Sequence, residues 1–155
     1  MDKPTKTAKQ LLDSKRFGVA GVVSVGPDDT VLDALRLMAD RNVGAVAVCK
    51  DGMLVGIMTE RDCARKLELQ GRTAGSTQVR EIMTLSVVCA NPADSVDRCR
   101  VLLSQHRIRH LPVCEGRTVL GVLSSRDILE ELLNEEEHLL HELEIERLEI
   151  TNNIY

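Results

Sequence analysis

The chain contains an internal repeat with an offset of 65 residues, and this repeat limits the possible folds more than any other feature. Residues 23–67 align with residues 88–132 without a gap, and 11 of the 45 aligned pairs are identical. Composition alone would give about three or four identities over this length. Since many other pairs keep their chemical character, the sequence predicts two copies of one structural unit.

Each copy is predicted to follow the order strand, helix, strand, strand, helix. In the first copy we expect an extended apolar segment at 19–25, a helix opened by Thr30 and ending near 41, strands at 45–49 and 53–58, and a helix at 60–70. The residue pair Asp51-Gly52 tolerates positive φ and suits a tight hairpin. In the second copy we expect an extended segment at 86–90, a helix opened by Ser95, strands at 111–114 and 118–123, and a helix from about 126 to 150.

Two units of this size would each leave much of a small sheet exposed. The sequence therefore predicts an α+β fold in which two β-α-β-β-α repeats pack by pseudo-twofold symmetry, followed by a C-terminal helix. The predicted divisions are an N-terminal segment at 1–18, the first domain at 19–71, a linker and lead-in at 72–85, the second domain at 86–132 and an acidic helical tail at 133–155.

Charge is distributed unevenly along the chain. Residues 1–129 carry a formal charge of +4, whereas residues 130–155 carry nine Glu against one Arg and total −8. The acidic tail and the near absence of aromatic residues argue against nucleic-acid binding. With five cysteines in no metal-binding spacing, no signal sequence and no apolar run long enough for a bilayer, we expect a reduced cytoplasmic protein with no metal site and no membrane contact.

Three stretches of the repeats resemble those of a known family. The sequences V-G-I-M-T-E-R-D at 55–62 and L-G-V-L-S-S-R-D at 120–127 are similar to the signature that closes each cystathionine-β-synthase-type (CBS) domain, and 108–113 and 79–84 also look like segments of that family. The chain thus resembles a tandem CBS pair, or Bateman module. This resemblance implies binding of AMP, ADP, ATP, NAD or S-adenosylmethionine in clefts between the two domains, and a tendency to form homodimers.

The chemistry of the motifs fits such a ligand. A helix N-terminus follows Thr59 and Ser124, so backbone N–H groups and the helix dipole favour a phosphate there. The hydroxyl groups of Thr59 and Ser124 are predicted to contact phosphate, and the carboxylates of Asp62 and Asp127 to accept hydrogen bonds from ribose hydroxyls. The same spacing also describes an ordinary capping box, in which these side chains only close the helix.

Other candidate ligand contacts come from the residues just before the strand predicted at 111–114, and from apolar residues in both copies. Arg107, Arg109 and His110 are predicted to bind phosphate together with Arg61 and Arg126, although these cations also fit a solvated surface or pairing with tail glutamates. The first copy has Asn42, Gly44 and Ala45 instead. The adenine slot is predicted from apolar side chains: Val23, Ala45, Val46, Ile57, Val88, Leu111 and Val122. The family resemblance adds backbone groups of Val23, Ser24, Val88 and Cys89 at the purine edge.

The sequence therefore predicts a regulatory module that senses energy or redox state through an adenine nucleotide and signals to an unidentified protein partner. No catalytic constellation and no catalytic cofactor are predicted, so we expect no enzyme activity. The alternatives are a structural dimerisation module with empty sites, or a sensor of S-adenosylmethionine. The tail has an apolar stripe that could cover its own domain or cross to a second chain, but Glu135–Glu137 interrupts a clean coiled-coil seam.

Overall fold

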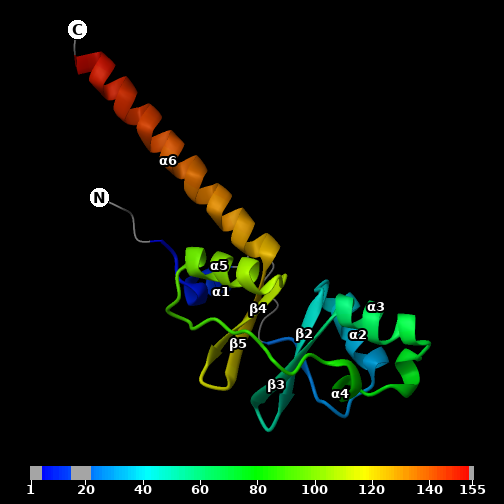
Figure 1. The fold of residues 1–155 in the computed structure, drawn as a ribbon. Helices are drawn as coiled ribbons and strands as arrows, with labels where there is room; N and C mark the ends of the chain where they lie inside the picture. Colours follow the sequence, from blue (N-terminus) through cyan, green and yellow to red (C-terminus); the bar gives the residue numbers. More distant parts are fainter. Residues whose placement is uncertain (1–4, 15–21, 154–155) are drawn as a thin grey trace.

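The computed structural model describes residues 5–14 and 22–153 (Figure 1). Of the extended segment predicted at 19–25, residues 19–21 lie outside the described residues. The first half of the chain contains α1 (Ala8–Ser14), β1 (Ser24–Val25), α2 (Val31–Arg41), β2 (Ala45–Lys50), β3 (Met53–Thr59), α3 (Glu60–Lys66) and the 3₁₀ turns Glu68–Gln70 and Ala74–Ser76. The second half contains α4 (Val79–Ile82), α5 (Val96–His106), β4 (His110–Glu115), β5 (Thr118–Ser124) and α6 (Ser125–Asn153).

This element order confirms the predicted fold of two repeats and a C-terminal helix. The first strand is short in both copies, since β1 pairs with β2 in parallel over two residues and its counterpart is a single bridge between Ala90 and Val113. The strand pairs β2–β3 and β4–β5 are antiparallel and have the same register, including a shift at the equivalent positions Val48/Cys49 and Val113/Cys114.

Local sequence explains where most of these elements begin and end. The hydroxyl groups of Thr30 and Ser95 accept hydrogen bonds from the third helical N–H, as N-caps do. Helices α2 and α5 both end at a left-handed residue, Asn42 or Arg107. The hairpin turn at Asp51-Gly52 has positive φ at both residues, which is the conformation that the sequence predicted.

The short helices that precede the repeats are exchanged between them. Helix α4 precedes the second repeat but packs on the first, where the N–H groups of Val79 and Arg80 donate to the carbonyls of Asp29 and Pro27. Helix α1 precedes the first repeat but packs on the second, where the N–H groups of Ala8 and Lys9 donate to the carbonyls of Asp94 and Pro92. These matched bonds are the clearest expression of the pseudo-twofold relation.

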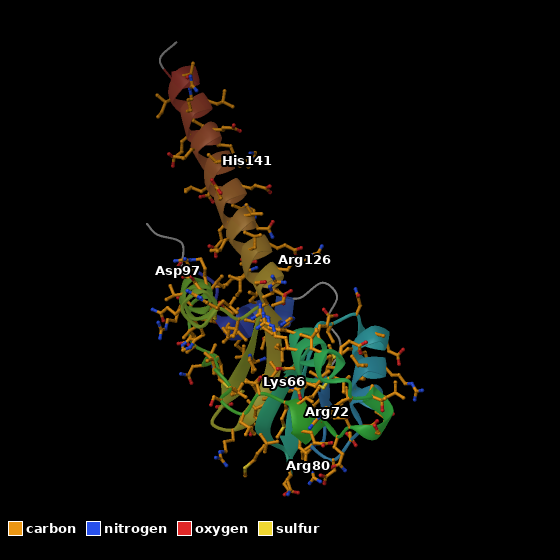
Figure 2. The ribbon with its side chains drawn as sticks, turned by 45° about the vertical axis from the view of Figure 1, so that its right-hand side comes forward. Lys66, Arg72, Arg80, Asp97, Arg126 and His141 are labelled. Atoms are coloured by element: carbon orange, nitrogen blue, oxygen red, sulfur yellow. The ribbon has the colours of Figure 1, made fainter. Side chains whose placement is uncertain are left out.

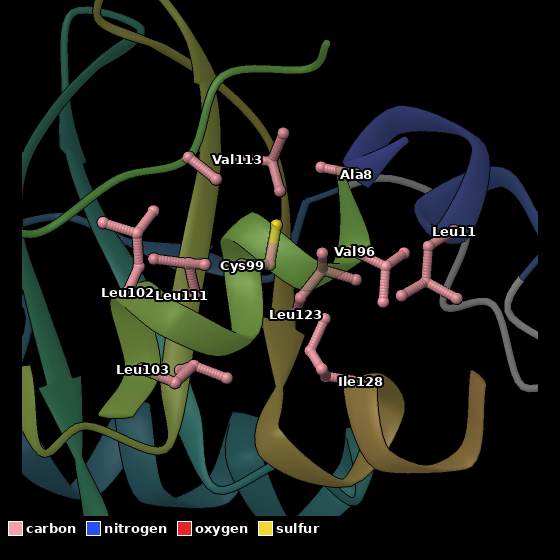
Figure 3. Close-up of a cluster of buried hydrophobic side chains, with 11 residues drawn as sticks. Ala8, Leu11, Val96, Cys99, Leu102, Leu103, Leu111, Val113, Leu123 and Ile128 are labelled. Atoms are coloured by element: carbon pink, nitrogen blue, oxygen red, sulfur yellow. The ribbon is translucent and has the colours of Figure 1, made fainter. Parts of the chain in front are cut away.

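The exchange creates one hydrophobic core in each repeat and a third cluster between them. In the core of the second repeat, Ala8 and Leu11 of α1 lie beside Val96, Leu123 and Ile128 (Figure 3). In the first repeat, Val79 and Ile82 of α4 take the equivalent places. The cluster between the repeats is built from the two hairpins and their surroundings: Ala47, Cys114 and Val119, with Val22, Cys49 and Leu54 packed against them.

Helix α6 begins on the second repeat and then leaves the body of the molecule (Figure 1). Ile128 is buried in the core. The carboxylate of the buried Glu131 accepts a hydrogen bond from Lys6 Nζ at 3.2 Å. None of the described helices is long and apolar enough to cross a membrane.

Candidate ligand-binding cleft between the repeats

The Thr59–Asp62 motif of the first repeat forms a complete capping box. The backbone N–H of Thr59 donates to Asp62 Oδ2 at 3.0 Å, and the N–H of Asp62 donates to Thr59 Oγ1 at 3.2 Å. Asp62 Oδ1 also accepts from Thr84 Oγ1 at 3.1 Å and lies 2.9 Å from Lys66 Nζ. Because Asp62 is only 6% exposed and both oxygens have partners, its carboxylate holds α3, α4 and the end of β3 together.

The Ser124–Asp127 motif has the same local geometry with different surroundings. The N–H of Ser124 donates to Asp127 Oδ2 at 2.7 Å, and the N–H of Asp127 donates to Ser124 Oγ at 3.1 Å. The residue four positions later is Glu131, where the first repeat has Lys66, and its carboxylate is paired with Lys6. Asp127 is half-buried and has no lysine of its own helix beside it.

The turns before β2 and β4 meet across the repeat boundary. A Cβ placed on Gly44 would lie 3.1 Å from Nε2 of His110 and 3.6 Å from a carboxylate oxygen of Glu60. Arg61 donates to the carbonyl of Arg107 at 3.5 Å. The small residue in the first repeat thus makes room for the imidazole of the second, and the starts of α3 and α6 lie next to this contact because Glu60 and Ser125 donate to the carbonyls of the same two turns.

Three arginines at this boundary form no ion pair with the acidic side chains that the structure describes. Among the described residues, Arg61, Arg107 and Arg109 form no ion pair, and all three are exposed. The predicted alternative, in which these arginines pair with glutamates of the tail, is therefore not seen among the described residues. Arg126 differs, because it pairs with Glu130 at 3.1 Å on the exposed surface of α6 (Figure 2).

The residues predicted to contact adenine lie on two different faces of the hairpins, because side chains alternate along each strand. Val46 and Leu111 are fully buried in the cores of their own repeats. Since successive side chains of a strand point to opposite faces, their neighbours point towards the other repeat. That face carries Ala45, Ala47, Ile57 and Thr59 in the first repeat, and His110, Val122 and Ser124 in the second. Val23 and Val88 are half-buried at the edges of the two cores.

The first-strand positions Ser24 and Cys89 are equivalent, but they have different chemistry. The Sγ of Cys114 donates to Sγ of Cys89 at 3.5 Å, and this hydrogen bond lowers the pKa of Cys89 to about 7. Burial instead raises the pKa of Cys49, which a hydrogen bond with Ser24 partly offsets. All five cysteines of the chain are free thiols.

Two cavities lie close to these positions but not at the capping boxes. One, of about 310 Å³, is mainly apolar and lies between α5 and the start of α6, with Leu103, Ile108 and Leu129 in its lining. The other, of about 190 Å³, is lined by Cys89, Cys114 and Arg117 together with Leu54 and Leu85. Of the predicted site residues, only Cys89 lines either cavity.

Sequence reasoning missed several residues that surround the Thr59–Asp62 motif. Glu60, Lys66 and Thr84 were not singled out, and the exchange of α1 and α4 was not predicted. A signal for the exchange was present, because residues 6–12 resemble residues 77–83 at an offset of 71 rather than 65. That similarity would have identified α1 and α4 as equivalent helices, but not the repeat on which each one packs.

Comparison with known proteins settles the family. The family model for the CBS domain matches twice, at residues 18–69 and 79–134. The chain belongs to the CBS domain family. Its closing motifs and its doubled hairpins are therefore those of a CBS pair, as the resemblance implied. In this pair, residues 135–155 lie beyond the matched domains.

Among its relatives, the pair is 40% identical over 126 residues to the CBS domain-containing protein CBSX3, mitochondrial, of Arabidopsis thaliana. The match covers 78% of this chain and 59% of that relative, so the chain spans less than two thirds of its length. A signal-transduction protein with CBS domains from Burkholderia ambifaria has a similar structure, with 39% identity and a TM-score of 0.78 over 83% of this chain and 95% of the other.

A third similar structure was solved with ligands. The CBS domain pair of protein MJ0100, in complex with 5′-methylthioadenosine and S-adenosyl-L-methionine, is 25% identical and has a TM-score of 0.72. The match covers 85% of this chain and 99% of that one. CBS pairs are thus regulatory, ligand-binding modules, and a related pair binds adenosine compounds.

Proposed function

We propose that this chain is a regulatory sensor that binds an adenine nucleotide in the cleft between its repeats. The proposal rests on three exposed arginines, Arg61, Arg107 and Arg109, which form no ion pair among the described residues and whose backbone lies beside the N-termini of α3 and α6. Guanidinium groups and first-turn N–H groups both bind phosphate well. The module would signal occupancy to a protein partner and act as a homodimer.

In this proposal the two capping boxes have different roles. Asp127 accepts hydrogen bonds from the ribose hydroxyls, with Ser124 close to the phosphate, because its half-buried side chain is more accessible than that of Asp62. Asp62 is already held by Thr84 and Lys66. The adenine lies against the alternating face that carries Ala45, Ile57 and Val122, with the ends of the first strands at its edge.

The charge of the cleft favours some adenosine compounds over others. AMP, ADP, ATP and NAD carry phosphate, whereas S-adenosylmethionine carries a positive sulfonium and no phosphate. Three arginines that form no ion pair among the described residues would repel the sulfonium and attract the phosphates. We therefore place the phosphorylated nucleotides ahead of S-adenosylmethionine, although the related pair of MJ0100 was solved with the latter.

Calorimetry of the purified full chain with AMP, ADP, ATP, NAD, adenosine and S-adenosylmethionine tests this proposal at two salt concentrations. We expect nucleotides to bind at least about tenfold more tightly than adenosine, since each charge-assisted hydrogen bond contributes about 1.5–3 kcal/mol. Added salt should weaken nucleotide binding more than adenosine binding. Equal affinity for adenosine and AMP at both salt concentrations would refute the phosphate assignment.

Variants separate the two halves of the ligand. Arg107→Ala with Arg109→Ala should weaken nucleotides and leave adenosine unchanged, whereas Asp127→Ala should weaken both. Arg98→Ala is the matched control, because Arg98 is an exposed arginine on α5 outside the cleft. If none of the ligands binds, the second candidate stands: a structural dimerisation module. The fully engaged carboxylate of Asp62 already fits that role in the first repeat.

A further inference from the structure

The outer part of α6 is exposed to solvent along its whole described length. The helix runs over 29 residues, and every described residue from 136 to 151 is exposed. Figures 1 and 2 show this part standing away from both repeats, with His141 far from the body. An unsupported helix of this length is only marginally stable in water, because most helix stability in proteins comes from packing of one face.

The exposed part nevertheless carries large apolar side chains. Leu133, Leu140, Leu143 and Ile150 are 49–61% exposed. The CBS domain match ends at residue 134, so nearly all of this stretch is an addition to the family fold. Contiguous exposed apolar residues on a helix indicate an interaction surface.

These four residues share one helix face with two charged residues. Leu133, Glu136, Leu140, Leu143, Arg147 and Ile150 follow each other at alternating spacings of three and four residues. This is the heptad spacing of a coiled-coil seam, with the two charges at core positions. We call these six residues the α6 seam; it spans about 27 Å of helix.

We propose that the α6 seam binds the α6 seam of a second copy of this chain in antiparallel orientation. The seam is symmetric about the peptide bond that joins His141 to Glu142. In antiparallel pairing about that point, Leu140 meets Leu143 of the partner and Leu133 meets Ile150 of the partner. Glu136 then meets Arg147 of the partner, and the same contacts occur again by twofold symmetry. Each pair joins the two core positions of the heptad, as antiparallel coiled coils require.

The charged positions select both the orientation and the occupant. Arg147 is the only Lys or Arg after Arg126, yet it lies at the position that antiparallel pairing places opposite Glu136. A parallel pair would set Glu136 against Glu136 and Arg147 against Arg147, which is unfavourable at core positions. The antiparallel arrangement also places opposite ends of the helix dipoles side by side. Because the seam is complementary to itself, a second copy fits it better than an unrelated basic helix.

Variants of the whole chain in which charged seam residues are exchanged test the pairing. Sedimentation equilibrium measures how tightly each variant associates. Arg147→Glu sets two glutamates against each other, and Glu136→Arg sets two arginines against each other, so each should weaken the α6 association by about tenfold or more. The double variant E136R/R147E restores the opposite charges only if the helices are antiparallel, and it should recover the affinity. Glu149→Arg is the matched control, because it makes the same charge change outside the seam and should leave association unchanged.

A cysteine pair checks the orientation independently. If the helices are antiparallel, a Leu140→Cys chain mixed with a Leu143→Cys chain should form a disulfide cross-link on oxidation. Each variant oxidised alone should cross-link poorly. No native cysteine lies on α6, so the cross-link is assigned by peptide mapping. A monomeric wild-type chain, association that none of the charge variants changes, or failure of the double variant to recover would each overturn the proposal. Binding of nucleotide does not enter these measurements, so they remain decisive if the proposed ligand is wrong.

Discussion

Asp62 and Asp127 are equivalent residues of the two repeats, and they have different tertiary partners. Both accept a hydrogen bond from the N-cap backbone and both begin a helix. Asp62 also binds Thr84 of the exchanged helix segment and Lys66 of its own helix. At the place of Lys66 the second repeat has Glu131, whose carboxylate binds Lys6 from the N-terminal segment.

This difference shows that one local motif can serve two purposes. The first repeat uses its aspartate to join α3 to the segment after α4, and in the second repeat Glu131, one turn further along α6, binds the segment before α1. A buried carboxylate that binds a hydroxyl group and a lysine contributes to stability, whereas a half-buried carboxylate at the equivalent place is more accessible to a ligand. Three comparisons between equivalent positions of the two repeats test this division.

The largest effect is expected for the two aspartates. Asp62→Ala removes a buried acceptor and leaves the Thr84 hydroxyl without its acceptor and Lys66 with only the carbonyl of Ile82, so we expect it to reduce the free energy of unfolding by about 2–3 kcal/mol. Asp127→Ala removes a half-buried carboxylate that caps α6 and should cost less, about 1–2 kcal/mol. Urea unfolding followed by circular dichroism measures both losses. Equal losses would mean that the two repeats use their aspartates in the same way.

A smaller difference is expected for the two glycines that contact the exchanged segments. A Cβ on Gly56 would lie 2.7 Å from Met83 Sδ and 3.1 Å from the backbone carbonyl of Thr84, whereas the three atoms nearest to one on Gly121 all belong to the side chain of Leu12, the nearest at 2.9 Å. Because backbone yields less easily than a side-chain tip, Gly56→Ala should destabilise by about 1–2 kcal/mol and Gly121→Ala by less.

Thermal unfolding is a suitable measurement for these glycine variants, and Gly75→Ala is the control. A Cβ on Gly75 would make only an ordinary contact, 3.9 Å from Leu32. If Gly121→Ala proves the more damaging, then α1 is held to the second repeat more rigidly than α4 is held to the first.

The smallest difference concerns thiol reactivity at the equivalent pairs Ser24/Cys49 and Cys89/Cys114. Cys89, with a pKa of about 7, should be about half thiolate at neutral pH, and its alkylation rate should fall as pH decreases below 7. Burial raises the pKa of Cys63 and of Cys99 to about 11, so both should react slowly. Peptide mass spectrometry after timed treatment with iodoacetamide measures each site.

The variant Cys114→Ala sharpens this last comparison. It removes the S–H group that donates to Cys89, so the pKa of Cys89 should rise and its alkylation at pH 7 should slow severalfold. Unchanged alkylation of Cys89 in this variant would show that another group lowers its pKa.

The sequence by itself was sufficient to determine the repeat, the order of elements and most of their ends. Thr30 and Ser95 cap their helices as predicted, and the Asp51-Gly52 turn adopts the predicted positive φ angles. The hairpin strands begin and end within a residue or so of their expected positions. Each of these features depends on residues within a few positions along the chain, where side-chain type and spacing determine the hydrogen bonds.

Only the tertiary structure decided which repeat each of α1 and α4 covers, how Asp62 is enclosed, and why Gly44 stands opposite His110. These features join residues far apart in the sequence, and the segments of α1 and α4 have similar local patterns. Two similar helices and two similar docking surfaces allow either assignment. The choice between them depends on the packing of whole segments against one another, a property that no short stretch of sequence contains.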